Sequence, residues 1–319
     1  MFQLRPRVST DIFMQKNIVT SGEKFTDIDA LSCAVAYSEL LTLEGKESEV
    51  VLPGILNTSI TQAIKDWGIK YTTSPTFSDA EYTVVDVSDP EQIAEFVEEE
   101  RIAKLFDHHL GFEGYWQERI GEKAQIEFIG ACATLIWEEY KKRGREKNIS
   151  KLSCDLLSVG ILSNTLNFGA HITHDRDRQA FQELQALHPL SGEWIAQYFS
   201  DQEEDINKDI AESVTNDTKV ITDLNLKHPL VIGQLELWNG SDFLEKNLEL
   251  IKQTLSGFKS EYWFMSIPSL KEKKNYIYTE HPEIRELLSK VLDITFEGDR
   301  GVTQRLWLRK EILRELYSL

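Results

Sequence analysis

Short apolar runs in the first third of this chain end at, or just before, a carboxylate. Tyr-Thr-Val-Val precedes Asp86, Lys-Leu-Phe precedes Asp107, and Asn-Ile-Val-Thr precedes the loop that carries Asp27 and Asp29. Runs of this length and composition are typical of buried strands. If the strands are parallel, their carboxyl ends meet at one edge of the sheet, where open α/β sheets bind ligands. The pattern therefore predicts that these acids converge.

Two histidines, His108 and His109, follow Asp107 directly. Carboxylates that are held close together repel one another unless cations lie among them, and an imidazole can add a further ligand. The convergence therefore predicts a site for divalent metal ions at this edge of the sheet. In the alternative interpretation, the aspartates cap helices or turns and the histidines are hydrogen-bonded loop residues.

Composition limits the classes of function. With 53 acidic and 35 basic residues, the net charge is −18, which disfavours binding along a nucleic-acid backbone but leaves room for a local anion pocket. Cys33, Cys132 and Cys154 lie in apolar segments without metal-ligand spacing, as expected of buried, reduced thiols. The opening Met-Phe-Gln-Leu-Arg-Pro-Arg lacks the apolar core of a signal peptide, and no stretch reaches membrane-spanning length. We therefore expect a cytoplasmic protein without a membrane partner.

The apolar spacing predicts alternating strands and helices, typical of a doubly wound parallel sheet. We expect strands at 49–52, 82–85 and 104–106, and helices at 30–41, 60–67, 91–99, 132–142 and 154–162. The polar run Ser200-Asp-Gln-Glu-Glu-Asp is either a solvated helix start or an interdomain linker. Beyond it we expect strands at 230–237 and 262–266, and helices at 243–255 and 282–292. The 319 residues are thus predicted to form two domains, 1–200 and 205–319.

An ordered set of segments carries a family resemblance. The segments are Gly22-Glu-Lys-Phe-Thr-Asp-Ile-Asp29, Val85-Asp86, Asp107-His108-His109, Gly130-Ala-Cys-Ala-Thr134, Ser163-Asn164-Thr165-Leu166, Asp217-Thr218-Lys219 and Leu308-Arg309-Lys310. They resemble motifs of the DHH phosphoesterase superfamily: Gly-His-x-x-Pro-Asp-x-Asp, Val-Asp, Asp-His-His, Gly-(Ser/Cys)-Thr-Ala-Thr, Ser-Asp-(Ser/Thr)-Leu, Asp-x-Lys and Ser-Arg-Lys. The whole chain from about residue 17 resembles the two-domain branch that includes manganese-dependent (family II) inorganic pyrophosphatases and exopolyphosphatases.

The resemblance implies a fold and a site. The fold would be a doubly wound N-terminal domain and a smaller α/β (DHHA2-like) domain, with the active site in the cleft between them. Two divalent ions, Mn²⁺ or Mg²⁺, would be bridged by Asp86 and would supply the hydroxide that attacks a phosphoanhydride. The first ion would take Glu23, Asp27 and Asp86, and the second Asp29, Asp86, His108 and Asn164. Asp107 would orient an imidazole, and the substrate phosphates would meet His109, Lys219, Arg309 and Lys310.

The chain departs from the family pattern at two of these ligands. Glu23 stands where the family has histidine, and Asn164 where it has aspartate, so the summed negative charge around the ions is unchanged. A first site made only of oxygen ligands suits Mg²⁺ or Mn²⁺. The neutral carbonyl of Asn164 weakens the second site, unless a water takes its place. A weakened homologue that binds anions or regulates another protein is therefore an alternative to a full enzyme.

We expect a metal-dependent hydrolase of phosphoanhydrides, with pyrophosphate as the first substrate to test. Polyphosphate or another small phosphoester is the alternative substrate, the partner would be a small anionic phosphate and not nucleic acid, and a homodimer is possible. The acidic charge disfavours an oligonucleotide-degrading enzyme. Two points stay open. His171 or His174 could supply a replacement ligand, and Gln304-Arg305 is a second register for the closing motif.

Overall fold

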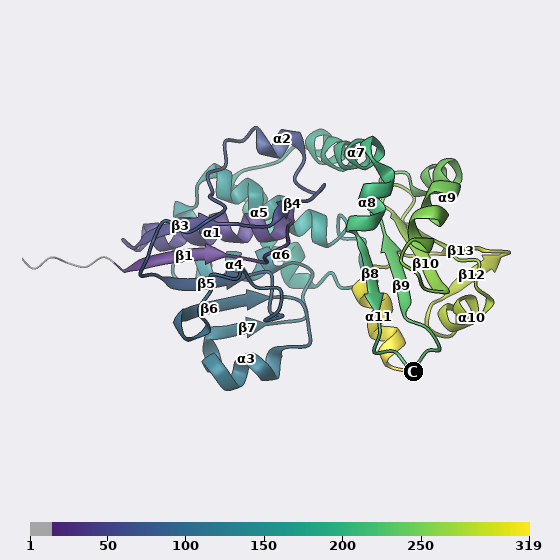
Figure 1. The fold of residues 1–319 in the computed structure, drawn as a ribbon. Helices are drawn as coiled ribbons and strands as arrows, with labels where there is room; N and C mark the ends of the chain where they lie inside the picture. The colour runs from purple at the N-terminus through teal and green to yellow at the C-terminus, as the bar shows by residue number, and fades with distance from the viewer. Residues whose placement is uncertain (1–14) are drawn as a thin grey trace, which may run out of the picture.

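The computed structural model describes residues 15–319, which form two sheets with helices packed on their faces (Figure 1). The sequence predicts that no signal peptide is present. That prediction depends on residues 1–7, which lie outside the described residues. Within the described part of the chain, no helix combines the length and the apolar character that crossing a membrane requires.

The first sheet consists of parallel strands in the order β3-β1-β5-β6-β7. Its strands are β1 (Lys16–Thr20), β3 (Glu47–Val51), β5 (Glu81–Val85), β6 (Ile102–Asp107) and β7 (Ala124–Ile126). Valine, isoleucine and threonine recur in these strands because branched side chains fit a sheet that is buried on both faces. Two further strands, β2 (Phe25–Thr26) and β4 (Ile55–Leu56), pair in parallel as a separate ribbon.

Helices cover both faces of this sheet, so the predicted doubly wound arrangement is confirmed. The larger face is packed by α1 (Ile28–Leu43), α4 (Cys132–Lys142) and α5 (Lys151–Asn164), with α6 (Asp175–Leu187) against α4 and α5. On the other face, α3 (Glu113–Ile120) inserts Trp116 into the core. The expected helix at 60–67 is a single turn, α2 (Gln62–Lys65).

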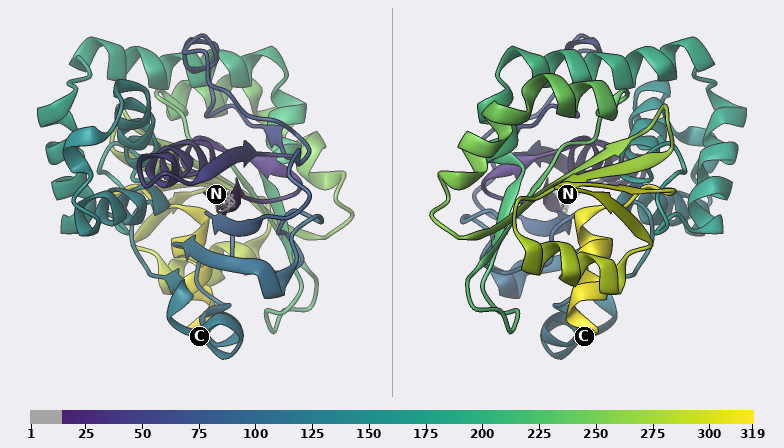
Figure 2. Two further views of the ribbon diagram at one scale, coloured as in Figure 1. Left: turned by 90° about the vertical axis from the view of Figure 1, so that its left-hand side faces the viewer. Right: turned by 90° about the vertical axis from the view of Figure 1, so that its right-hand side faces the viewer.

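The second sheet is mixed and has the order β12-β13-β11-β10-β9-β8. Its strands are β8 (Thr218–Ile221), β9 (Leu230–Gln234), β10 (Tyr262–Ser269), β11 (Lys274–Tyr278), β12 (Ile294–Glu297) and β13 (Arg300–Thr303). Separate apolar cores form on its two faces. One is closed by α8 (Ile210–Asn216) and α9 (Gly240–Ser256), and the other by α10 (Pro282–Val291) and α11 (Arg309–Tyr317), as Figure 2 shows.

The two halves of the molecule touch through an apolar contact beyond the end of α5. Leu306 and Leu308 come from the second half but are buried in the core of the first. A Cβ atom on Gly169 would lie 2.5 Å from Cδ1 of Leu306, so a larger residue there would have to displace this leucine. The acidic run that begins at Ser200 is helical and forms the second half of α7 (Gly192–Lys208). The domain boundary predicted there stays a prediction.

One expected helix is wrong. Residues 91–98 form turns, and Glu99–Arg101 form a short 3₁₀ segment. The backbone of this stretch is instead paired with the loop after β1: Glu23 N–H donates to the Gln92 carbonyl (2.8 Å), and Ala94 N–H donates to the Ser21 carbonyl (3.2 Å). Tertiary pairing therefore overrides the helical tendency of the glutamates.

Candidate metal centre and anion-binding cleft

Asp86 follows β5 with a backbone conformation that aspartate seldom adopts. Its φ angle is +60°, in the left-handed region. The Asp86 N–H donates to the Phe106 carbonyl of the neighbouring strand at 2.8 Å, which holds the residue in this conformation. Its side chain is almost wholly enclosed, with 5% of its surface exposed. Strain of this kind persists where the surrounding structure over-determines it, often at functional sites.

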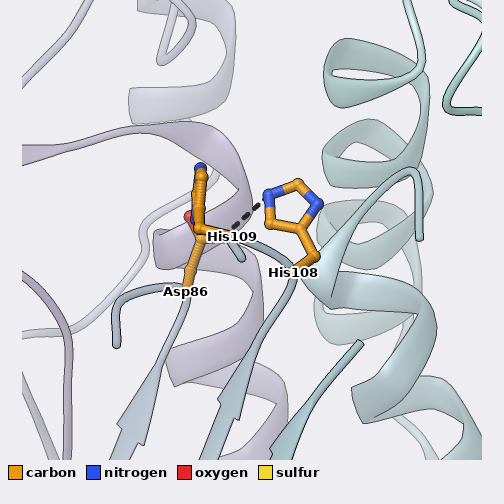
Figure 3. Close-up of side chains that lie close together, drawn as sticks. All are labelled: Asp86, His108 and His109. Atoms are coloured by element: carbon orange, nitrogen blue, oxygen red, sulfur yellow. Dashed lines mark ion pairs between the residues drawn. The ribbon is translucent and has the colours of Figure 1, made fainter. Parts of the chain in front are cut away.

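His108 points its free nitrogen at two buried carboxylates. Nδ1 lies 3.1 Å from the Ile129 carbonyl, which can only accept, so Nδ1 carries the proton. Nε2 of the neutral ring therefore presents a lone pair, and it lies 3.3 Å from Oδ1 of Asp86 (Figure 3) and 3.9 Å from Oδ2 of Asp29. Among the described residues, neither this nitrogen nor Oδ1 of Asp86 has a hydrogen-bond partner. Facing acceptors of this kind are stabilised by a proton or a metal cation between them.

Asp107 organises the loop that carries the two histidines. Its Oδ1 accepts hydrogen bonds from the backbone N–H of His108 (2.7 Å) and His109 (3.2 Å), and it lies 2.8 Å from Nδ1 of His109. The ring of His109 is thereby fixed, although 49% of its side chain is exposed. One ligand atom each from Asp86, His108 and His109 lie within 4.8 Å of one another. This matches the ligand spacing of a metal site.

Asp29 is held by the N-terminus of α4. Its two carboxylate oxygens accept from the backbone N–H groups of Cys132 (2.8 Å) and Ala133 (2.9 Å), and the residue is fully buried. These donors and the helix dipole favour the charged form. Burial and the neighbouring Asp27 outweigh them and raise the pKa of Asp29 to about 7. Burial, then Asp27 and Asp29, likewise raise the pKa of Asp86 well above its usual range.

Burial lowers the pKa of His108 well below its usual value, and the charge of Lys310 lowers it further. The acids are thus driven towards their protonated forms while the imidazole is driven towards its neutral form. A buried cation would relieve both effects, because it compensates the carboxylate charges and coordinates the free imidazole nitrogen. The donor set of oxygen and imidazole nitrogen suits Mn²⁺ or Mg²⁺.

The structure brings together some of the remaining predicted ligands but not all of them. Asp27 lines the same cleft as Asp86, and its Oδ1 also caps α1 by accepting from Ala30 N–H at 2.9 Å. Asn164, the last residue of α5, lines the cleft as well. Glu23 does not, because its carboxylate accepts from the Glu95 N–H at 3.0 Å. The pairing of this loop with residues 92–95 turns Glu23 away from the cleft.

Cations from the second half line the opposite wall of the cleft. Arg309 and Lys310 begin α11, and Lys219 lies on β8. Arg309 is fixed by the side chain and the carbonyl of Asp217, at 2.7 Å each. Burial lowers the pKa of Lys310, while Asp86 and Asp29 oppose that shift, so Lys310 lies within electrostatic reach of the candidate metal centre.

Lys219 is reached by solvent, yet the enclosing walls of the cleft and the charge of Arg309 lower its pKa. The cleft encloses about 750 Å³. The carboxylates of Asp27 and Asp86 thus lie on the wall of the first half, and Lys219, Arg309 and Lys310 lie on that of the second. This arrangement suits an anion held between metal ions and basic side chains.

Sequence reasoning missed three acids of this cleft, Asp209, Glu212 and Glu236, of which Glu236 has a strongly shifted pKa. Glu236 lies on the wall formed by the second half, where Gln234 Nε2 donates to its Oε1 at 2.9 Å. Burial and the charge of Asp217 raise the pKa of Glu236 to about 8. Glu236 could have been found from the sequence, because it follows the end of strand β9 as Asp86 follows the end of β5.

The two open points are decided by geometry. His174 caps α6, with Arg176 N–H donating to its ring at 3.3 Å, and neither it nor His171 is among the residues that line the cleft. Arg305 lies over the Trp307 ring at 3.2 Å, outside the cleft. The register Leu308-Arg309-Lys310 is therefore the one that delivers cations to this site.

Comparisons with known proteins agree with the motifs. The chain is 23% identical over 304 residues to a probable manganese-dependent inorganic pyrophosphatase of Exiguobacterium sp., covering 92% of this chain and 95% of that protein. It is 21% identical over 299 residues to one of Staphylococcus carnosus, covering 91% and 94%. No family model matches the chain.

Solved structures show the same fold. A Methanococcus jannaschii protein provisionally described as a family II inorganic pyrophosphatase superposes with a TM-score of 0.69 at 20% identity, covering 95% of this chain and 98% of that one. An exopolyphosphatase-related protein of Bacteroides fragilis gives 0.52 at 13% identity, covering 95% and 91%. The predicted resemblance to manganese-dependent (family II) inorganic pyrophosphatases and the predicted fold class are confirmed.

Proposed function

We propose that this chain, which resembles the manganese-dependent inorganic pyrophosphatases, is a metal-dependent phosphohydrolase that cleaves a phosphoanhydride, with pyrophosphate as its first substrate. The observation that carries the proposal is the pair of unpartnered acceptors, Oδ1 of Asp86 and Nε2 of His108, at 3.3 Å. Asp86 lines the same cleft as the basic side chains of Lys219, Arg309 and Lys310.

Divalent ions, Mn²⁺ or Mg²⁺, would be held by Asp27, Asp29, Asp86, His108 and Asn164. When bound, the ions supply an activated water and a clamp on the phosphoryl oxygens. Glu23 would join them only after releasing the Glu95 N–H. The set without Glu23 still offers carboxylates from two strand ends and one helix N-terminus, so the centre does not depend on it.

The remaining residues act on the substrate. Lys219, Arg309 and Lys310 bind the phosphate oxygens, and each charge-assisted contact contributes roughly 1.5–3 kcal/mol. Asp107 holds the His109 ring through Nδ1, so Nε2 of that ring is directed outward as a donor or acceptor for a phosphate. Because cations and carboxylates come from different halves, an anion draws the halves together and excludes water.

Phosphate release from pyrophosphate, measured with the full chain in Mn²⁺ and again after chelation, tests this function. We expect turnover with Mn²⁺ and its loss with the chelator, restored by added metal. Turnover that survives chelation would contradict a metal mechanism. Absence of turnover together with tight pyrophosphate binding would instead favour the alternative, a homologue that binds anions without cleaving them.

A further inference from the structure

The cleft carries an apolar surface beside the candidate metal centre that no phosphate contact uses. Phe25 and Ile55 are 49% and 72% exposed, and both line the cleft. They are direct partners in the parallel β2–β4 pair. Partners in a parallel pair point to the same face, so the two side chains form one continuous surface. Phe25 lies only two residues before Asp27.

The facing element, α8, presents a polar stripe to the same cleft. Its lining residues are Asp209, Glu212, Ser213 and Asn216, spaced so that they share one face of the helix. Asp209 is fixed as the N-cap by accepting from Glu212 N–H at 2.9 Å. In Figure 1, α8 and the β2–β4 ribbon lie on opposite sides of the gap between the two halves. One wall thus carries an exposed apolar pair beside the polar side chains of Lys24, Asn57, Thr58 and Ser59, and the other accepts hydrogen bonds.

Building on the proposed function, we propose that the site also takes a nucleoside diphosphate, whose base rests on Phe25 and Ile55 while its sugar hydroxyls meet the α8 stripe. An apolar, aromatic surface suits the flat face of a base. Carboxylates such as Glu212 accept hydrogen bonds from ribose hydroxyls, as acidic residues do in dinucleotide sites. The cleft volume of about 750 Å³ falls within the range of roughly 300–1,000 Å³ that encloses ligands of this size.

The same features disfavour a longer inorganic polyphosphate. Lys24 and Lys208 line the cleft together with Lys219, Arg309 and Lys310, but the α8 stripe also contains Asp209 and Glu212. These carboxylates would face the further phosphates of a longer chain and repel them. A neutral sugar and base carry no such charge.

The reaction is a hydrolysis. The oxygen of water forms a bond to the terminal phosphorus, and the bond from that phosphorus to the bridging oxygen breaks. The bridging oxygen stays on the nucleoside monophosphate, and orthophosphate leaves with the water oxygen. The proton released by water balances the charge on the products, so the step needs no other reactant.

The test compares adenosine diphosphate, pyrophosphate and tripolyphosphate as substrates of the full chain in Mn²⁺. The variants are Ile55→Ala, Phe25→Ala and, as a matched control, Leu250→Ala. Leu250 is 38% exposed on α9 and does not line the cleft. We expect each cleft variant to lower the ratio of kcat/KM for adenosine diphosphate to that for pyrophosphate by about tenfold, and Leu250→Ala to leave the ratio unchanged. Ile55→Ala keeps the test sound, because removing so exposed a side chain leaves no cavity.

The outcomes separate the two claims. Cleavage of pyrophosphate but not of adenosine diphosphate, or preference for tripolyphosphate, overturns the inference and leaves the proposed function standing. If no substrate is cleaved, the proposed function fails, and calorimetric binding of adenosine diphosphate decides the inference: binding weakened about tenfold by Ile55→Ala supports it, and unchanged binding overturns it. A native dimer that Ile55→Ala dissociates would show that a second copy covers this surface, and would also overturn the inference.

Discussion

One ring nitrogen of His108 donates a hydrogen bond to a backbone carbonyl. That bond determines the protonation state of the other ring nitrogen. Because Nδ1 donates to Ile129, Nε2 can only accept, and it faces Oδ1 of Asp86. The meeting of Asp86, Asp107 and His108 could be predicted from the sequence, since strand ends converge in parallel sheets. The position of Glu23 could not be predicted, because it depends on backbone pairing with residues far along the chain.

Glu236 leads to a prediction about pH. The groups that act on it are Asp217 and Asp27, which raise its pKa, and Lys310 and Arg309, which lower it, with burial dominant and a resulting value of about 8. The carboxyl is therefore neutral at pH 7 and becomes negative as the pH rises through about 8. We expect the KM for pyrophosphate to rise severalfold as the pH rises through about 8. The new negative charge of Glu236 offsets the positive charge of Arg309 and Lys310 and so weakens their attraction for the anion.

Glu236→Gln should remove this rise, since glutamine keeps the shape and cannot ionise. Glu297→Gln, at an exposed position of β12, is the control and should behave as the native chain does. Steady-state KM measured from pH 7 to pH 9 is the readout, over the interval that the pKa of Glu236 sets. A KM profile that is identical in Glu236→Gln and the native chain would contradict this role.

At the scale of elements, close packing of α1, α4 and α5 positions Asp29. A Cβ atom on Gly160 of α5 would lie 2.6 Å from Oγ of Ser32, 3.2 Å from Oδ1 of Asp29 and 3.3 Å from Cβ of Ala133. The sequence predicts α4 with its observed bounds. It could not predict this approach, because helix contacts between distant segments leave no local pattern beyond a glycine.

Gly160→Ala should therefore destabilise the protein and weaken Mn²⁺ binding, although alanine favours helices. We expect a loss of about 1–3 kcal/mol from overpacking. Gly114→Ala is the matched control, because a Cβ there meets nothing within 4 Å, and helix propensity should stabilise it by about 0.5–1 kcal/mol. Denaturant unfolding and metal titration of both variants provide the measurement. Equal stabilisation in the two would refute the packing argument.

At the scale of the whole molecule, the site exists only where two halves meet. The metal candidates come from the first half, at the ends of β5 and β6, the start of α1 and the end of α5, and the cations come from β8 and the start of α11. The sequence motifs predict which residues lie on each of the two walls of the cleft. They do not indicate how the walls are held together, to which Leu270, Leu306 and Leu308 of the second half contribute by packing in the core of the first. The predicted boundary between residues 200 and 205, the cytoplasmic location and a homodimer stay predictions.

Leu306→Ala should uncouple the halves. Leu306 is 2% exposed and lies in the core of the first half, and deleting such a side chain costs about 2–5 kcal/mol. We expect scanning calorimetry to show two unfolding transitions in place of one. Leu316→Ala removes most of a leucine side chain that is buried within the second half. This variant should be less stable but should show the same number of unfolding transitions as the native chain. Identical profiles for the two variants would contradict a coupling role for Leu306.

The measurement that tests the central claim most directly is Mn²⁺ titration by calorimetry of the metal-stripped native chain, Asp86→Asn and Asp293→Asn. Asp293 is exposed and is not among the residues that line the cleft, and it serves as the charge-matched control. The account predicts that the native chain and Asp293→Asn bind Mn²⁺ alike, and that Asp86→Asn loses about 100-fold or more in affinity. Undiminished Mn²⁺ binding by Asp86→Asn would show that the cluster of Asp86 and His108 is not the metal centre.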